Sequence, residues 1–259
     1  MSVGARVREL AAAYEPPSFE EVPNPDAALF LTAIDHRTGY RGSYRVAGAG
    51  PYEGSALLWA LGLRAEEREP GTLSAASLAE VVPDRVAELF AIGGETAVGP
   101  EIRARLWRDL ARGLVARYAG SAERLLEACE GRLGDSGGLI ALLGKFEAFS
   151  DPLRKKSYLF AKIAERRGWL DVADLPHWQV CADNVLMRLA LRSGLVESGP
   201  EAEVRAATRE AFRRVAEETG VSPPVLDDLL WELGREDPDL LGPNRDLREP
   251  PRPDGTHWY

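Results

Sequence analysis

The sequence is poor in the residues from which metal sites and disulfide frameworks are built. Among its 259 residues are only two cysteines and three histidines. Cys129 and Cys181 each lie within a helical pattern, and no pair of cysteines or histidines has metal-ligand spacing. We therefore expect no disulfide framework and no metal site, and a reducing cytoplasmic environment fits this composition.

The sequence also has no long apolar run and few runs of β-branched residues. No stretch approaches the ~20 apolar residues that span a membrane, and residues 1–14 have the pattern of an amphipathic helix rather than a secretory signal. Apolar residues still make up 45% of the chain, which suffices for a packed core. We expect a mainly α, cytoplasmic protein without a membrane partner.

Positive charge is in deficit as well. The chain has 32 basic and 41 acidic residues, which gives a formal net charge of −9. Proteins that hold polyanions usually show a basic footprint, so a nucleic-acid partner is not expected, although a local basic patch can still form in the fold. The densest basic run, Arg154–Lys156, would suit one phosphate group better than a duplex.

No linker or internal repeat divides the chain. We expect one domain over residues 1–259: an N-terminal helix and small β element in 1–70, a helical body in 71–235 and an extended tail in 236–259. The apolar run Ala27–Ile34 has the length of a strand, and with Tyr40–Val46 it predicts a small hairpin. Helices are expected at 52–65, 74–90, 100–118, 121–133, 139–149, 152–167, 183–194, 200–219 and 223–235.

Asp183 is the leading candidate for a catalytic residue. It precedes an amphipathic helical pattern, where an Asp side chain can accept the free N–H groups of the first turn. The partial positive charge of a helix N-terminus favours the ionised carboxylate. A fixed anion of this kind can stabilise an oxocarbenium-like sugar while a glycosidic bond breaks. On the capping pattern alone, an ordinary helix with an Asp cap is the simpler explanation of Asp183.

Two lysines form the second candidate. Lys155 and Lys156 lie in the first turn of a helix that Asp151 and Pro152 are expected to open. A lysine here can attack a sugar as an amine or supply positive charge. Because cations are unfavourable at a helix N-terminus, a bound phosphate would account for them. A solvated basic helix start is an equally simple explanation.

Candidate substrate-binding residues complete the set. Asp35 and His36 follow the apolar run, in a position that suits either a site or a turn. Aromatic side chains can stack on a base, although most aromatic side chains pack in cores. The candidate binding residues are Lys156, Asp35, His36, Phe146, Tyr158, Asp227, Trp231, Trp258 and Tyr259. Trp258 and Tyr259 stand apart, since two large aromatic residues at the end of the sequence are expected to dock.

Several short segments together resemble a known family. Residues 181–196 are similar to the Asp-containing segment of helix-hairpin-helix base-excision glycosylases. Seven segments in order resemble motifs of the queuosine salvage family, the queuosine 5′-phosphate N-glycosylases: 33–36, 52–65, 144–151, 154–160, 181–196, 203–206 and 226–231. Each motif alone is weak, but they are collinear from about Ala27 to Tyr259.

The resemblance implies a helical, DNA-glycosylase-like domain with a small β element. It places the family's catalytic Asp on Asp183 and its Lys on Lys155. The family's Asn and Phe are replaced by Asp35 and His36, so the catalytic frame is kept while positions expected to contact the base differ.

The predicted function is hydrolysis of the N-glycosidic bond of a modified nucleoside or nucleoside 5′-monophosphate. No cofactor is needed, and a monomer or weak homodimer is expected. One alternative is a DNA base-excision glycosylase and lyase with a catalytic Lys155 or Lys156. A second alternative is a non-catalytic nucleoside-binding protein, which would tolerate the loss of Asp183.

Overall fold

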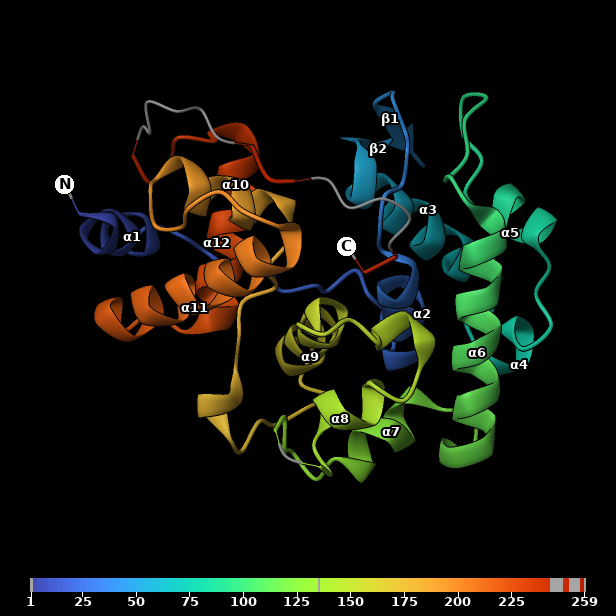
Figure 1. The fold of residues 1–259 in the computed structure, drawn as a ribbon. Helices are drawn as coiled ribbons and strands as arrows, with labels where there is room; N and C mark the ends of the chain where they lie inside the picture. The colour runs from blue at the N-terminus through green and yellow to red at the C-terminus, as the bar shows by residue number, and fades with distance from the viewer. Residues whose placement is uncertain (1, 135, 243–248, 252–256, 259) are drawn as a thin grey trace.

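The computed structural model describes residues 2–134, 136–242, 249–251 and 257–258, and helices dominate this part of the chain (Figure 1). The expected mainly α fold class with a small β element is confirmed. The helices are α1 (Val3–Ala11), α2 (Pro25–Ile34), α3 (Gly54–Arg68), α4 (Ala75–Leu78), α5 (Pro83–Leu89), α6 (Pro100–Tyr118), α7 (Ala122–Ala128), α8 (Leu139–Leu143), α9 (Lys155–Arg166), α10 (Asn184–Arg192), α11 (Glu201–Thr219) and α12 (Pro223–Glu236), with 3₁₀ turns η1 (Glu147–Phe149) and η2 (Leu175–His177). None of the described helices is long and apolar enough to span a membrane.

The apolar core consists of two clusters of buried side chains. The larger cluster gathers side chains from α2 to α9, whereas the smaller one joins α1 to α10, α11 and α12. Helix α1 therefore packs against α11 and α12, far from it in sequence, on the left of Figure 1. Cys181 belongs to the larger cluster and Val185 to the smaller one. Asp183 thus lies where the chain passes between the two clusters.

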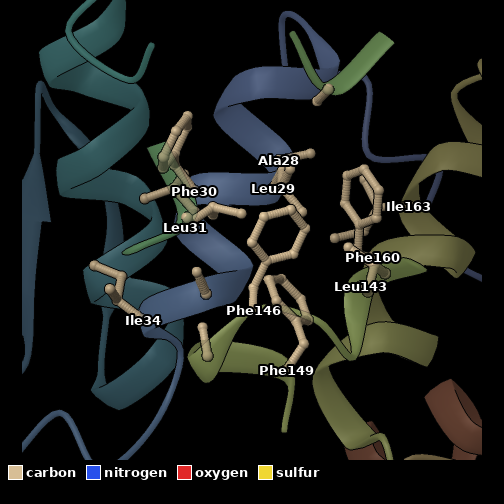
Figure 2. Close-up of a cluster of buried hydrophobic side chains, with 14 of the residues drawn as sticks. Ala28, Leu29, Phe30, Leu31, Ile34, Leu143, Phe146, Phe149, Phe160 and Ile163 are labelled. Atoms are coloured by element: carbon tan, nitrogen blue, oxygen red, sulfur yellow. The ribbon is translucent and has the colours of Figure 1, made fainter. Parts of the chain in front are cut away.

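Helix α2 corrects the prediction of a strand over Ala27–Ile34. Every residue of that run is buried, and the rings of Phe146, Phe149 and Phe160 gather beside the helix in Figure 2. A helix that is buried on all sides has no polar face, so its sequence shows a continuous apolar run like that of a buried strand. The Asn24 side chain caps it by accepting the Ala27 N–H at 2.8 Å.

The β element is smaller than expected and lies after α2. Strands β1 (Tyr44–Val46) and β2 (Ala49–Tyr52) form an antiparallel hairpin, with Tyr44 opposite Tyr52. The helix expected over 74–90 is divided into α4 and α5, because Pro83 begins a new helix. Similarly, the helix expected over 139–149 ends at Leu143 and continues as η1.

Helix α9 begins three residues later than the sequence predicts. Asp151 does act as a capping side chain, because its carboxylate accepts the N–H groups of Leu153 (3.0 Å) and Lys155 (2.8 Å). Arg154 has a φ of 58°, in the left-handed region, so regular helix starts only at Lys155. This late start determines which lysine faces the candidate site.

Candidate active site

Asp183 caps the N-terminus of α10, as predicted. Its Oδ1 accepts the N–H groups of Val185 at 2.9 Å and Leu186 at 3.1 Å, and the side chain is buried. Burial raises the pKa of Asp183 and outweighs the opposing effects of Lys155 and the two N–H groups, so the pKa lies above that of an exposed Asp. The carboxylate is therefore fixed in place but only partly compensated.

Lys155 is the lysine that faces Asp183. Its Nζ lies 3.8 Å from Oδ2 of Asp35, at the C-terminal end of α2. Burial alone would lower the pKa of Lys155, but the carboxylates of Asp35 and Asp183 outweigh it and raise this pKa. Lys155 is therefore protonated at neutral pH and acts as a cation between two carboxylates.

Asp35 and Ser55 complete this side of the site. The Ser55 hydroxyl donates to Asp35 Oδ1 at 2.6 Å, so Ser55 in the first turn of α3 fixes the carboxylate that faces Lys155. The site is thereby assembled from the end of α2, the start of α3, the start of α9 and the start of α10. Asp35 was predicted from its position after the apolar run, but Ser55 was not singled out.

Lys156 points away from Asp183 and into the larger core. It is fully buried, donates from Nζ to the Ala33 carbonyl at 2.7 Å, and lies 3.2 Å from His36 Nδ1. The other ring nitrogen, Nε2, lies 2.8 Å from Nη1 of Arg103. Because a guanidinium can only donate, His36 Nε2 accepts, and the proton of the neutral imidazole is on Nδ1.

The same hydrogen-bond pattern sets the charge of Lys156. His36 Nδ1–H donates toward Lys156 Nζ, which must then offer a lone pair and be an unprotonated amine. Burial is the main cause that lowers the pKa of Lys156 well below its ordinary value, and the nearby Lys155 cation lowers it further. Burial likewise lowers the pKa of His36. Lys156 and His36 are thus neutral members of a buried polar cluster and not exposed substrate ligands.

The phosphate anchor expected at residues 154–156 is not assembled in the structure. Asp151 already accepts the N–H of Lys155, the first residue of α9, and that of Leu153 before the helix. Arg154 turns back to donate to the Phe149 carbonyl at 2.9 Å, and Lys156 is buried. Of these three basic residues, only Lys155 lies beside the carboxylates of the candidate site.

Asp227 holds the backbone that precedes Asp183. Its Oδ1 accepts the Cys181 N–H at 2.6 Å, and its Oδ2 accepts from Lys162 Nζ at 2.6 Å. Both oxygens are therefore engaged inside the protein, and the side chain is only 4% exposed. Asp227 supports the loop that carries Asp183, which corrects the prediction that it binds substrate.

The aromatic candidates divide between core and boundary positions. Phe146 is part of the larger core (Figure 2), which corrects its assignment to the binding site. Tyr158 is buried with its ring 6.4 Å from that of Trp178. Trp231 packs at the edge of the smaller cluster, under the guanidinium of Arg235 at 4.8 Å. Within the part of the chain that the structure describes, Phe146, Tyr158 and Trp231 have their recorded ring and cation contacts with residues other than Asp183 and Lys155.

The end of the chain returns to the body. The half-buried ring of Trp258 packs against the smaller cluster. His257 donates from Nε2 to the Glu147 carbonyl at 3.0 Å, and its ring lies 6.2 Å from that of His36. In Figure 1 the short red segment of residues 257–258 accordingly lies near α2. Tyr259 lies outside the described residues.

A basic groove of about 530 Å³ runs along α6, apart from Asp183. Asp109 and Glu147 also line it. Its cationic lining residues are Arg105, Arg108, Arg112, Arg117 and Lys145. The overall acidic composition did not exclude a local basic patch, and this groove is such a patch. It adjoins the tail, since Glu147 accepts the hydrogen bond from His257.

Sequence reasoning missed three side chains that organise the site. Ser55, Arg103 and Arg205 each bond to a candidate residue or its neighbour from a distant helix. Arginines are frequent throughout this sequence, so neither arginine carries a local signal. Among the described residues, no group of three or more His, Cys, Asp or Glu could hold a metal ion.

The comparisons with known proteins bear on the fold. No protein-family model matches the sequence, and no curated protein is similar to it. Among solved structures, the chain is similar to endonuclease III trapped as a covalent intermediate with DNA, at 14% identity and a TM-score of 0.55, over 90% of this chain and 84% of that one. This likeness shows that the chain shares the helical fold of that structure.

A second similar structure is the 8-oxoguanine DNA glycosylase Pa-AGOG from Pyrobaculum aerophilum, complexed with 8-oxoguanosine. It is 18% identical over 90% of this chain and 78% of that one, and its TM-score of 0.39 is too low to support a structural argument. The resemblance to the queuosine salvage family stays a prediction from sequence.

Proposed function

We propose that this protein hydrolyses the N-glycosidic bond of a modified nucleoside or nucleoside 5′-monophosphate. One observation carries the proposal: a buried carboxylate, Asp183, is fixed at a helix N-terminus beside the Lys155 cation, in a glycosylase fold. A carboxylate that is held by the backbone and shielded from water stabilises a developing sugar cation strongly, because no reorganisation is needed at the moment of reaction.

In the proposed reaction, the bond between C1′ and the base nitrogen breaks while positive charge develops on the sugar. Asp183 faces that charge and orients a water molecule, whose oxygen bonds to C1′ and whose proton is transferred to the departing base. Lys155 stays protonated and lowers the pKa of Asp183 against the larger effect of burial, which favours the ionised carboxylate. Lys155 also offers a cation to a hydroxyl or phosphate oxygen of the substrate.

A queuosine 5′-phosphate-like nucleotide is the substrate that the sequence resemblance favours. Because Lys155 is the member of the basic run 154–156 that lies at the site, we expect a nucleoside 5′-monophosphate to be cleaved with higher kcat/KM than its nucleoside. Base release from paired nucleosides and monophosphates, measured by liquid chromatography and mass spectrometry, checks this expectation. Equal kcat/KM for both members of each pair would show that no phosphate contact is made.

A DNA base-excision glycosylase is the second candidate, and the basic groove along α6 favours it. In that case a substrate strand would lie along Arg108 and Arg112, and a lysine at the site could form a Schiff base with the opened sugar. Borohydride trapping of the protein on duplexes with damaged bases separates the two functions. A trapped adduct that Arg112→Glu weakens would support the DNA enzyme, whereas release of base from free nucleotides without trapping supports the first proposal.

The docked tail gives a further testable prediction. Deleting residues 257–259 removes the His257 contacts with Glu147 and His36, so we expect a higher KM or lower turnover without a comparable fall in melting temperature. Steady-state kinetics of base release and thermal unfolding of the same preparations test this. Normal kinetics in the truncated protein would mean that the tail has no part in binding.

A further inference from the structure

Arg205, on α11, makes a buried, three-way connection next to the candidate site. Its two Nη atoms donate to both oxygens of Asp151, at 2.7 and 2.6 Å, and its Nε donates to the Ala182 carbonyl at 2.8 Å. Both side chains are nearly inaccessible, at 3% exposure for Arg205 and 0% for Asp151. Ala182 is the residue immediately before Asp183, so one end of this connection holds the backbone of the catalytic candidate.

The other end of the connection holds Lys155. The Asp151 carboxylate that receives Arg205 also accepts the Lys155 N–H at 2.8 Å and the Leu153 N–H at 3.0 Å. A single ion pair therefore links the residue before Asp183 to the first residue of α9. It also crosses between the two core clusters, because α9 packs in the larger one and α11 in the smaller one.

A buried ion pair is an inefficient way to stabilise a fold, because two charges must be removed from water before they attract each other. The Arg205–Asp151 pair is better suited to fixing the positions of the groups it binds than to stabilising the fold. A planar guanidinium can bind two carboxylate oxygens and one carbonyl in fixed directions, which a lysine ammonium on a flexible chain cannot reproduce. Although burial raises the pKa of Asp151, the bonds from Arg205 outweigh it, and the carboxylate stays ionised.

The loop before Asp183 is held from a second side as well. Asp227 of α12 accepts the Cys181 N–H, and Lys162 of α9 neutralises Asp227. Of these two supports, only the Arg205–Asp151 pair also binds the backbone of Lys155, through the N–H that Asp151 accepts. Arg205 therefore connects the backbone next to Asp183 with the backbone of Lys155.

We propose that Arg205 is a positioning residue, which holds Asp183 opposite Lys155 through the Ala182 carbonyl and the Asp151 cap. This inference rests on the proposed glycosylase function for its kinetic readout, but not for its structural one. Arg205 touches no reacting atom, and its substitution should change the rate of the chemical step rather than substrate binding.

The first test is the kinetics of Arg205→Lys, which keeps the charge but loses the planar fork. Since sub-ångström displacement of catalytic groups is costly, we expect kcat to fall by roughly 10- to 100-fold, with KM within about twofold of wild type. Arg213→Lys is the matched control, because Arg213 is on the same helix and makes exposed ion pairs with Glu210 and Glu217. Equal kcat in both variants would overturn the proposal.

Epistasis separates positioning from a general effect on folding. In an Asp183→Asn background, Arg205→Lys should cause little further loss of kcat, because the group it positions has lost its charge. An undiminished additional loss would show that Arg205 acts elsewhere. If Arg205→Lys does not fold, Asp151→Asn breaks the same connection from its other end and is subject to the same two comparisons.

A titration tests the proposal without any substrate. Carbon-13 spectra report the pKa of the Asp183 carboxyl group, assigned by its absence in Asp183→Asn. Arg205→Lys should shift this pKa, since the distance to Lys155 changes, whereas Arg213→Lys should not. If no tested nucleotide or DNA is cleaved but the titration shifts, the proposed function fails and the positioning link stands. An unchanged titration would overturn the link itself.

Discussion

Replacing Asp183 by Asn is expected to reduce turnover by at least ~10²-fold, because the variant loses the anion that faces the developing sugar cation. The shape of the site should be kept. An Asn side chain can accept the same N–H groups of Val185 and Leu186 that Asp183 Oδ1 accepts now. Initial rates of base release at saturating substrate measure the effect, and Asp171→Asn, at an exposed position, is the control.

The same variant makes a prediction about stability. The pKa of Asp183 is raised in the folded protein, so the native state binds this proton more tightly than the unfolded chain does. The ionised carboxylate therefore weakens the fold, and the stability that protonation provides is lost as pH rises through the raised pKa. At pH 7 Asp183→Asn should melt at the wild-type temperature or above it, and this difference should disappear in acid.

Together these two measurements distinguish a functional carboxylate from an ordinary helix cap. A side chain that only caps the helix would keep both its rate and its melting temperature in this variant, because Asn caps helices as well as Asp does, whereas a residue held for catalysis loses its rate and keeps its stability. Near-normal turnover in Asp183→Asn would reject the proposed mechanism.

The sequence predicts the site best where the signal is local. The Asp183 cap needs only one side chain and the N–H groups two and three residues later, so the helical pattern that follows Asp183 was sufficient to predict it. Asp151 was also found as a cap, but the left-handed Arg154 that delays α9 has no signature in a non-glycine residue. The start of the helix, and with it the direction of each lysine, could therefore not be predicted from spacing.

Long-range contacts account for most of what the sequence does not reveal. Asp35 meets Lys155 across 120 positions, and Arg205 reaches Asp151 across 54. Neither pair shares a helix face or a motif. The strand predicted over 27–34 was wrong for a related reason: a run with no polar face says only that the segment is buried, not which backbone conformation it has.

Substituting the two neighbouring lysines is expected to give opposite results. Lys155→Met removes the cation between Asp35 and Asp183, so the pKa of Asp183 should rise further and turnover should fall by at least ~30-fold at neutral pH. Lys156→Met removes a neutral amine and its two hydrogen bonds, with Ala33 and His36, but changes no charge at the site, so turnover should stay within about tenfold of wild type.

The pH dependence of the rate gives this comparison its sharpest test. The active form carries ionised Asp183, so activity should fall as pH decreases through the raised pKa, at higher pH than for an exposed Asp. In Lys155→Met this acidic limb should move to still higher pH, because a favourable cation is gone, while Lys156→Met should leave it nearly unmoved. The raised pKa of Lys155 also means that no basic limb should arise from its deprotonation near neutral pH. If Lys156→Met instead loses most of its turnover, and the acidic limb of the residual rate is unmoved, the chemistry belongs to the buried, unprotonated amine.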